Sequence, residues 1–248
     1  MVITDAPSLL RNTNPSPEGF YEDRALYLQV VSDRLSLRYK DFRHHNKTGP
    51  IAELIFIILS TRTEEYNYLR SYAALKRRFS RWESLTRADE TAIAEEINIG
   101  GLASLKARQI KSILREINLR EGRISLSSLR PLSDFEVEAY LTSLHGIGVK
   151  IARCIMLYAF GREVFPVDAH CWRVSQRLGI IDPTISKRSM SLRHVDELQK
   201  RIPEALRFKL HVNFISLGRE ICQDPRPKCS LCPLQDICPT ASANALSR

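Results

Sequence analysis

Four cysteines near the C-terminal end of the sequence have the spacing of a metal or cluster site. Cys222, Cys229, Cys232 and Cys238 follow the pattern C-x6-C-x2-C-x5-C in a short segment that also contains several prolines. Four thiolates at this density suit either a tetrahedral zinc ion or a [4Fe–4S] cluster. Because they are grouped and not spread along the chain, the cysteines predict ligation of a metal centre and not a disulfide framework.

A second pattern with chemical meaning is a glycine-containing turn before a lysine. Gly146 and Gly148 lie in the segment Leu-His-Gly-Ile-Gly-Val-Lys, which ends at Lys150. Glycines permit positive φ and leave the backbone amides uncovered. Exposed amides at the start of the next helix form an anion site that suits a DNA phosphate without any side-chain charge. A plain turn between two helices would use the same glycines, so the pattern alone leaves both interpretations open.

The elements around these residues have helical periodicity. Ser133–Glu136 reads as a capping box before a helix over 137–144, a second helix over 149–160 follows, and a third begins near 168. Apolar residues recur at helical spacing in the earlier run Ile51, Leu54, Ile55, Ile58 and Leu59. Alternating strand patterns of useful length do not occur. The sequence therefore predicts an all-α fold.

Composition limits the class of protein. The chain has 248 residues, 44% of them hydrophobic, and a formal net charge of +9. A basic balance favours a polyanion such as nucleic acid, although many ordinary proteins are also basic. No apolar run approaches the ~20 residues that span a bilayer, and the N-terminus lacks the pattern of a secretory signal. We therefore expect an intracellular protein that does not use a membrane.

Three segments together resemble one protein family. Residues 141–180 resemble the endonuclease III pattern L-P-G-(V/I)-G-x-K-T-A followed by V-D-x-H-(V/I)-x-R-(V/L)-x-x-R-L. Upstream, Leu59–Thr63 is similar to the L-S-x-Q-T segment of that family, and Gly101–Lys106 is similar to its G-(L/F)-x-x-x-K segment. With the cysteines included, the resemblance covers about residues 50 to 240.

The resemblance implies a fold and a division into domains. The fold would be that of the helix-hairpin-helix DNA glycosylases, in which two helical domains enclose a DNA-binding cleft. A six-helix domain would span residues 49–162, and a cluster domain would combine 19–48 with 163–240. Residues 1–18, which are rich in proline and small polar side chains, would form a flexible arm, and 241–248 a tail.

The family's catalytic pair falls on Lys150 and Asp168. A lysine amine must be neutral to attack the sugar C1′, and a helix N-terminus with partial desolvation is expected to lower its pKa. The amine would displace the base, form a Schiff base and allow β-elimination, while the carboxylate stabilises positive charge on the sugar. Two simpler roles remain open: Lys150 as a phosphate-binding lysine, and Asp168 as the N-cap of the next helix.

The same resemblance extends to the cluster and to the DNA contacts. The cysteine spacing matches the family's cluster loop, which favours [4Fe–4S] over zinc and gives the cluster a structural role. Arg226 and Lys228 in this loop are candidates for phosphate contacts, or solvated charges. Arg62 stands where many relatives have a glutamine that fills the space left by the flipped base. Leu102 stands where an apolar wedge is common, although core packing would explain a leucine equally well.

Together these features predict a base excision repair glycosylase with AP lyase activity. It would remove oxidised pyrimidines from double-stranded DNA, also cleave abasic sites, and act as a monomer. His145 and Ile151 replace the usual proline and threonine around the hairpin. These departures keep an alternative open, a divergent relative with mismatch-specific, weak or no glycosylase activity that acts mainly as a DNA-binding [4Fe–4S] protein.

Overall fold

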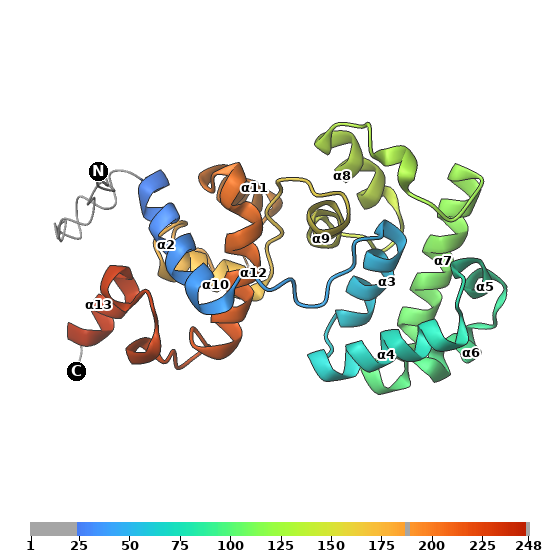
Figure 1. Cartoon of the computed structure of the whole chain (residues 1–248), viewed down its shortest axis with the longest axis horizontal. Helices are drawn as coiled ribbons and strands as arrows, with labels where there is room; N and C mark the ends of the chain where they lie inside the picture. Colours follow the sequence, from blue (N-terminus) through green and yellow to red (C-terminus); the bar gives the residue numbers. More distant parts are fainter. Residues whose placement is uncertain (1–23, 187–188, 247–248) are drawn as a thin grey trace, which may run out of the picture.

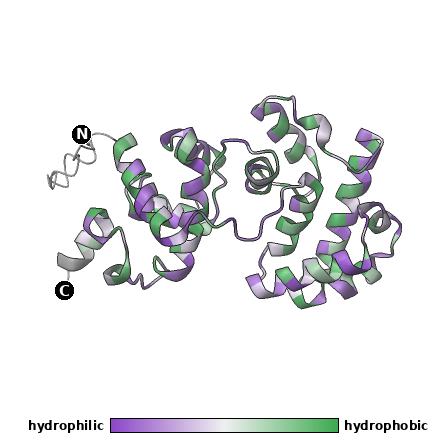
Figure 2. Cartoon of the chain, in the orientation of Figure 1, coloured by the Kyte–Doolittle hydropathy of each residue, from purple (hydrophilic) through white to green (hydrophobic). Residues whose placement is uncertain are grey.

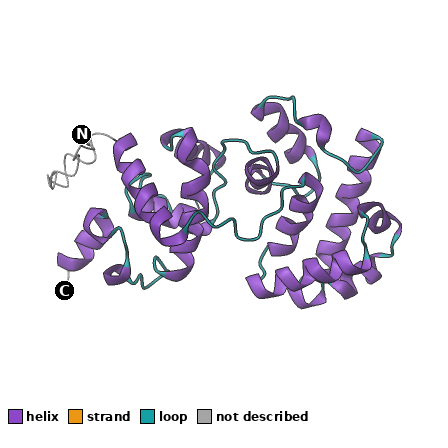
Figure 3. Cartoon of the chain, viewed as in Figure 1, coloured by secondary structure: helices purple, strands orange, loops and turns teal. Residues whose placement is uncertain are grey.

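The computed structural model describes residues 24–186 and 189–246, and throughout these residues the secondary structure is helical with no strand (Figure 3). The predicted all-α class is therefore confirmed. The arm predicted over residues 1–18 lies outside the described residues, as do 247 and 248 of the predicted tail. Within the described ranges, every helix is too short or too polar to cross a membrane.

The helices form two lobes in Figure 1. The first lobe contains α3 (Pro50–Ser60), α4 (Glu65–Arg78), α5 (Trp82–Arg87), α6 (Glu90–Glu96), η1 (Asn98–Gly100), α7 (Ala103–Glu121), η2 (Ser127–Leu129), α8 (Asp134–Ser143) and α9 (Val149–Ala159). The second contains α2 (Arg24–Tyr39), α10 (Ala169–Arg177), α11 (Leu192–Arg201), α12 (Glu204–Glu220), η3 (Cys229–Leu231), η4 (Gln235–Ile237) and α13 (Pro239–Leu246).

The first lobe is built around α3. This helix is apolar on nearly all sides and packs against α4, α7 and α9. A helix of this composition is stable only when neighbours cover it all round, and each fully buried leucine or isoleucine contributes about 1.5–3 kcal/mol. Leu54, Ile55 and Ile58 are each at most 1% exposed. The helical period predicted from Ile51 onward is thus confirmed, with α3 at the centre of the core.

The second lobe combines both ends of the chain. The N-terminal helix α2 packs against α12, which also packs against α10. Trp172, Phe165 and Phe214 are fully buried in this second core, separate from the core around α3. Hydrophobic residues accordingly occur on the helices of both lobes in Figure 2. We propose the domain division 49–162 against 19–48 plus 163–240, and the two separate cores support it.

One buried arginine joins the lobes. Arg153 of α9 is 4% exposed and pairs with Glu138 of α8 at 2.6 Å and with Asp196 of α11 at 2.5 Å. A charge buried to this degree needs such partners, because desolvation alone would be costly. The arginine therefore fixes the hairpin of the first lobe against the second lobe.

The helix-hairpin-helix follows the predicted local pattern. Ser133 caps α8 in a reciprocal capping box with Glu136, as predicted. Gly146 has a φ of 81°, and a Cβ there would lie 2.7 Å from the Gln109 side chain. Gly148 has a φ of −89° and is the N-cap of α9. Of the two glycines, Gly146 therefore uses the positive φ that glycine permits, whereas Gly148 has an extended backbone.

Candidate active site

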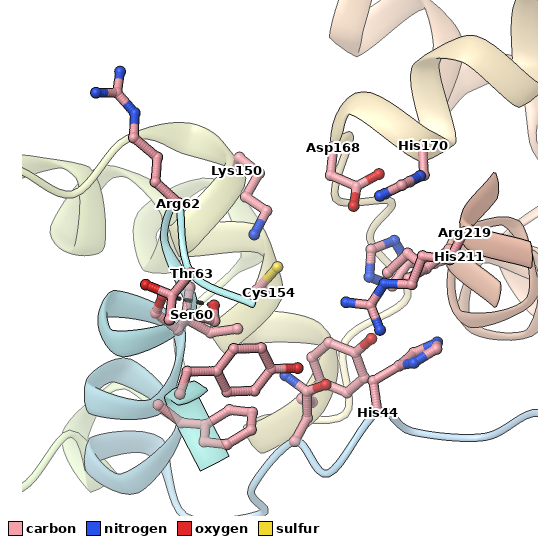
Figure 4. Close-up of a pocket in the computed structure, with 16 residues that line it drawn as sticks. His44, Ser60, Arg62, Thr63, Lys150, Cys154, Asp168, His170, His211 and Arg219 are labelled. Atoms are coloured by element: carbon pink, nitrogen blue, oxygen red, sulfur yellow. Dashed lines mark hydrogen bonds between the residues drawn. The ribbon is translucent and has the colours of Figure 1, made fainter. Parts of the chain in front are cut away.

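A pocket of about 250 Å³ lies between the two lobes and receives side chains from both (Figure 4). Its walls come from α3, α4, α9, the start of α10 and α12, together with connecting segments. The lining residues are His44, Asn46, Phe56, Ile57, Ser60, Arg62, Thr63, Tyr68, Lys150, Cys154, Tyr158, Asp168, His170, His211, Ile215 and Arg219. Lys150 and Asp168, predicted as a pair from the sequence, therefore share one pocket.

Lys150 is the second residue of α9 and extends its amine into the pocket, with Cys154 one turn further along the helix (Figure 4). The residue keeps an exposed surface, as an attacking group requires. The Cys154 sulfur, and then the Asp168 carboxylate, raise the pKa of Lys150 above its ordinary value, although burial opposes this. The expectation of a lowered pKa is therefore wrong for the free protein: the neighbouring groups outweigh the effect of burial, and Lys150 is an ammonium.

Asp168 enters the same pocket from the opposite lobe (Figure 4). It is the N-cap of α10, and its Oδ1 accepts a hydrogen bond from the Cys171 backbone N–H at 2.7 Å. Burial alone would raise the pKa of Asp168, but this hydrogen bond and the nearby His211 and Lys150 lower it below its usual value. Asp168 therefore has the capping role that the sequence left open. The same carboxylate is also ionised and shares the pocket with Lys150.

Two of the histidines that line the pocket, His170 and His211, were not among the predicted site residues. His170 lies within the family motif, whereas His211 lies outside it. His211 is 1% exposed and lies between the rings of Tyr158 and Phe165, with centroids at 5.7 and 5.9 Å. Burial lowers the pKa of His211 to about 4, so this ring is neutral. His170 lies so close to α12 that a Cβ on Gly218 would be 2.8 Å from it. A glycine at 218 thus lets α12 approach the pocket wall.

A buried carboxylate lies behind the pocket wall. Glu53 of α3 is fully buried and accepts hydrogen bonds from the Asn46 side chain at 2.5 Å and the Lys47 backbone N–H at 2.6 Å. Burial is the main cause that raises the pKa of Glu53 to about 7, while the positive charge of Lys150 lowers it. Glu53 has no distinguishing signal in the sequence, because it lies within an apolar helical run.

The two candidate DNA-contacting residues of the first lobe are at exposed tips. Arg62 follows α3 and points away from the pocket in Figure 4, while Leu102 precedes α7 and is 48% exposed. Both have a φ of 52°, which non-glycine residues adopt rarely. The core-packing interpretation of Leu102 is therefore wrong. A leucine side chain displayed at the surface in a strained conformation suits a contact with another molecule.

The four cysteines gather beside the second core, around η3 and η4. Three of them, Cys222, Cys232 and Cys238, pack against that core, and the described cysteines form no disulfide. Burial raises the pKa of the Cys232 thiol to about 11, and the charges of the other three cysteines contribute. Arg177 places Nη1 3.3 Å from the Cys222 sulfur. Across the described residues, no three metal-binding side chains converge around one point as a single ion requires.

Arg226 and Lys228 lie in the same segment and are exposed. Neither lines the pocket, so they do not join the Lys150 and Asp168 site. Side chains of α10 hold the backbone of the segment: Arg173 donates to the Cys222 carbonyl at 2.9 Å and Arg177 to the Gln223 carbonyl at 2.8 Å. The segment that carries the two basic residues is thereby fixed to the helix that Asp168 caps.

Comparison with known proteins agrees with this arrangement. The family model of the HhH-GPD superfamily base excision DNA repair protein matches residues 55–200. An Arabidopsis thaliana protein named as a candidate DNA glycosylase is 30% identical over 225 residues, which cover 90% of this chain and 75% of that protein. Endonuclease III of Sulfolobus acidocaldarius is 29% identical over 189 residues, with coverages of 75% and 80%.

Comparison with solved structures shows the same fold. A solved structure of a non-covalent endonuclease III–DNA complex superposes with a TM-score of 0.74 at 23% identity, over 90% of this chain and 98% of that one. Some matching plant proteins are far larger: the chain covers 12% of one named as a DNA glycosylase/AP lyase.

Two helical lobes, a glycine hairpin and a lysine–carboxylate pocket between them define a helix-hairpin-helix DNA repair enzyme. The chain belongs to the HhH-GPD superfamily of base excision DNA repair proteins. The predicted resemblance is thus confirmed, and so is the predicted enzyme class of the DNA glycosylases and AP lyases at the level of the family.

Proposed function

We propose that the protein is a bifunctional DNA glycosylase that releases a damaged pyrimidine and then cleaves the strand through a Schiff base on Lys150. The observation that carries the proposal is the meeting of Lys150 and Asp168 in one pocket, from different lobes and 18 positions apart in the chain. Lysine supplies the nucleophile that a lyase needs, and an ionised carboxylate opposite it stabilises positive charge on the sugar.

The charges of the pocket determine the order of events. Because the pKa of Lys150 is raised in the free protein, its ammonium must lose a proton before the amine attacks C1′. The amine then displaces the base, and the ring-opened sugar forms a Schiff base with Lys150. Loss of a C2′ proton expels the 3′ phosphate, and water releases the product from the lysine. Asp168 is ionised in the free protein, since its pKa lies below its usual value, and can stabilise positive charge as it develops on the sugar.

The pocket also suits a planar base turned out of the helix. Phe56, Tyr68 and Tyr158 supply aromatic walls, on which a flipped base can stack. Oxidised pyrimidines are our proposed substrates, because the family motifs resemble endonuclease III and because weakened pairing lowers the cost of flipping, which is roughly a few kcal/mol.

DNA binding would use both lobes. The amides at Gly146 and Gly148 are proposed to hold a phosphate at the start of α9, close to Lys150. Arg62 and Leu102 are proposed to enter the base stack, and Arg226 and Lys228 to hold phosphates from the other lobe. All six residues are exposed, as contact with double-stranded DNA requires.

We also propose that the cysteine segment carries a [4Fe–4S] cluster. The chemistry of the donor set fits: four thiols lie in one segment with few apolar contacts, close enough that, besides burial, the charges of the other three raise the pKa of Cys232, and Arg177 offers a positive group beside Cys222. Cys222, Cys229, Cys232 and Cys238 would be the ligands. When bound, the cluster would supply ligation energy that fixes the fold of this segment.

Borohydride trapping tests the catalytic proposal. Wild type, Lys150→Ala and Asp168→Asn are incubated with duplex DNA that contains either an abasic site or an oxidised pyrimidine. Trapping should be lost in Lys150→Ala. Base release should slow about a hundredfold in Asp168→Asn, a typical effect for the loss of one stabilising group. Asparagine still caps a helix, so this variant should keep its fold.

The exposed Lys209 on α12 provides a matched control, because it lies outside the pocket. Lys209→Ala should be trapped like wild type. Trapping of wild type on abasic DNA alone would retain the lyase and exclude oxidised pyrimidines. Failure of wild type to be trapped on either DNA, with DNA binding and the cluster intact, would contradict the proposal and favour a non-catalytic DNA-binding protein.

A further inference from the structure

Lys106 is a buried lysine that the chemistry above does not use. It lies in the first turn of α7 and is 3% exposed. Lysines are rarely buried unless partners satisfy the ammonium. Here Nζ donates to the Leu59 carbonyl at 2.8 Å, to Thr63 Oγ1 at 2.5 Å and to the Gly100 carbonyl at 3.2 Å. All three N–H groups of the ammonium therefore have an acceptor.

The three acceptors belong to the two exposed tips of the first lobe. Leu59 and Thr63 lie on either side of Arg62, and Gly100 lies two residues before Leu102. Thr63 Oγ1 also donates to the Gly100 carbonyl at 2.6 Å. Lys106 is thus the point at which the Arg62 tip and the Leu102 tip are tied to each other, although about 40 residues separate them in the chain.

Both tips need such support. Arg62 and Leu102 each have a φ of 52°, a conformation that persists only when the surrounding structure imposes it. Gly100, beside the second tip, packs so closely that a Cβ there would lie 2.9 Å from Ser71 Oγ. The Gly100 backbone is therefore held both by the ammonium of Lys106 and by tight packing against Ser71.

We propose that Lys106 is a positioning residue for nucleotide flipping, which holds the Arg62 and Leu102 tips at the spacing at which both enter the DNA stack together. Lys106 does not line the pocket, so its effect on the reaction passes through the tips. The inference rests on the proposed function, because it assigns DNA contacts to Arg62 and Leu102. It adds a residue that acts before chemistry and leaves the Lys150 and Asp168 step intact.

Lys111 provides a matched control on the same helix. It is also buried, at 8% exposure, and its Nζ donates to the Ala88 carbonyl, away from both tips. Lys106→Met and Lys111→Met each remove a buried ammonium from α7 and keep the length of the side chain. A loss of activity caused by destabilising α7 should appear in both variants. A loss of activity caused by displacement of the Arg62 and Leu102 tips should appear only in Lys106→Met.

Two substrates separate flipping from chemistry. Single-turnover base release is measured on a duplex with a paired oxidised pyrimidine, and borohydride trapping on a single strand with a preformed abasic site. Lys106→Met should slow base release about tenfold, since flipping costs roughly a few kcal/mol, and should change trapping less than about twofold. Lys111→Met should stay within about twofold of wild type on both. Should Lys106→Met fail to fold, Lys106→Gln, with two uncharged N–H donors, replaces it and should slow base release by a smaller factor.

A fluorescence readout decides the inference without the chemistry. A 2-aminopurine placed beside the lesion brightens when the stack opens. Brightening on binding of wild type and Lys111→Met, but not of Lys106→Met, would support the inference even if wild type neither released a base nor was trapped, in which case only the proposed function would fail. Two results would overturn the role of Lys106: equal brightening with all three proteins, or an equal loss of base release and of trapping in Lys106→Met. In either case an active wild type would still support the proposed function.

Discussion

Helix α3 in the first lobe is covered by apolar neighbours on nearly every side, whereas the cysteine segment of the second lobe, residues 222–238, has Leu234 as its one fully buried apolar residue. The two regions must therefore be stabilised by different interactions. Burial of hydrocarbon is sufficient for α3, since each large side chain adds about 1.5–3 kcal/mol. The cysteine segment has too little apolar surface to offset the entropy of ordering its backbone.

Polar contacts supply part of what the cysteine segment lacks. Arg34 of α2 donates to the Pro233 carbonyl at 3.3 Å and pairs with Asp236 at 2.5 Å. Both charged side chains are partly exposed, and pairs of this kind contribute about 0–1 kcal/mol. Under the proposed function, ligation of a cluster would supply the remaining stability of this segment, whereas the lobe around α3 is stabilised by burial of its own apolar side chains.

Loss of the proposed cluster should have the largest effect on stability. A small effect would contradict the contrast between the cysteine segment and α3. Cys229→Ala removes one proposed ligand, and we expect it to lower the stability of the second lobe by about 4–5 kcal/mol or more, in the range reached when a metal is lost. Visible absorption reports the cluster, and hydrogen exchange followed by mass spectrometry reports residues 222–238 and α3 separately. Exchange should rise in the former and stay unchanged in the latter.

Cys171→Ala is the control for this experiment. Cys171 is buried in the second core and is not among the proposed ligands, so its loss should leave the visible absorption unchanged. Unaltered protection of residues 222–238 in Cys229→Ala would show that polar contacts alone hold the segment.

Loss of the Arg153 link between the lobes should have the next largest effect on stability. Arg153→Ala leaves Glu138 and Asp196 without their partner, and we expect a loss of about 3 kcal/mol, the lower end for a broken buried pair, because both carboxylates keep some exposure. Urea unfolding monitored in each lobe should then give two separated transitions. The control Arg120→Ala breaks a pair with Glu116 and contacts with Ser143 and Tyr140, all inside the first lobe, and should cost about 1 kcal/mol without separating the transitions. A single unchanged transition in Arg153→Ala would show that other contacts join the lobes.

The pH dependence of stability tests how apolar the surroundings of Glu53 in α3 are. Its pKa is raised to about 7 from 4.5, so the folded protein holds a proton between these values that the unfolded chain releases. The resulting stability is complete below pH 4.5 and is lost as pH rises through 7. Glu53→Gln cannot titrate. Its stability relative to wild type should therefore increase by about 2 kcal/mol from pH 5 to pH 8, measured by thermal unfolding.

Asp182 in the second lobe gives the contrasting case. Hydrogen bonds from Thr184 lower the pKa of this exposed carboxyl, so it is ionised throughout that range. The difference between Asp182→Asn and wild type should not change between pH 5 and pH 8. If the stability difference between Glu53→Gln and wild type also stayed constant between pH 5 and pH 8, the surroundings of α3 would be more polar than their packing indicates.

Much of the molecule follows from patterns that are local in the sequence. The all-α class, the capping box at Ser133 and the cap at Asp168 depend on residues three or four positions apart, and the structure has all of them. The family motif likewise identified Lys150 and Asp168, which the structure brings into one pocket. A motif preserves such pairs even though spacing along the chain says nothing about the distance between them.

Other properties were decided by contacts between distant segments. The pKa of Lys150 depends on Cys154 and Asp168, and not only on the helix terminus that the sequence displays. The exposure of Leu102 and the three partners of Lys106 depend on how η1 and α7 pack against the end of α3. The sequence by itself determined the helices, their caps and the set of reactive residues, because these follow from short-range periodicity and chemistry. Charge states, strained tips and the pocket between the lobes arose only in the tertiary structure, because burial and electrostatic coupling depend on neighbours that the order of residues does not reveal.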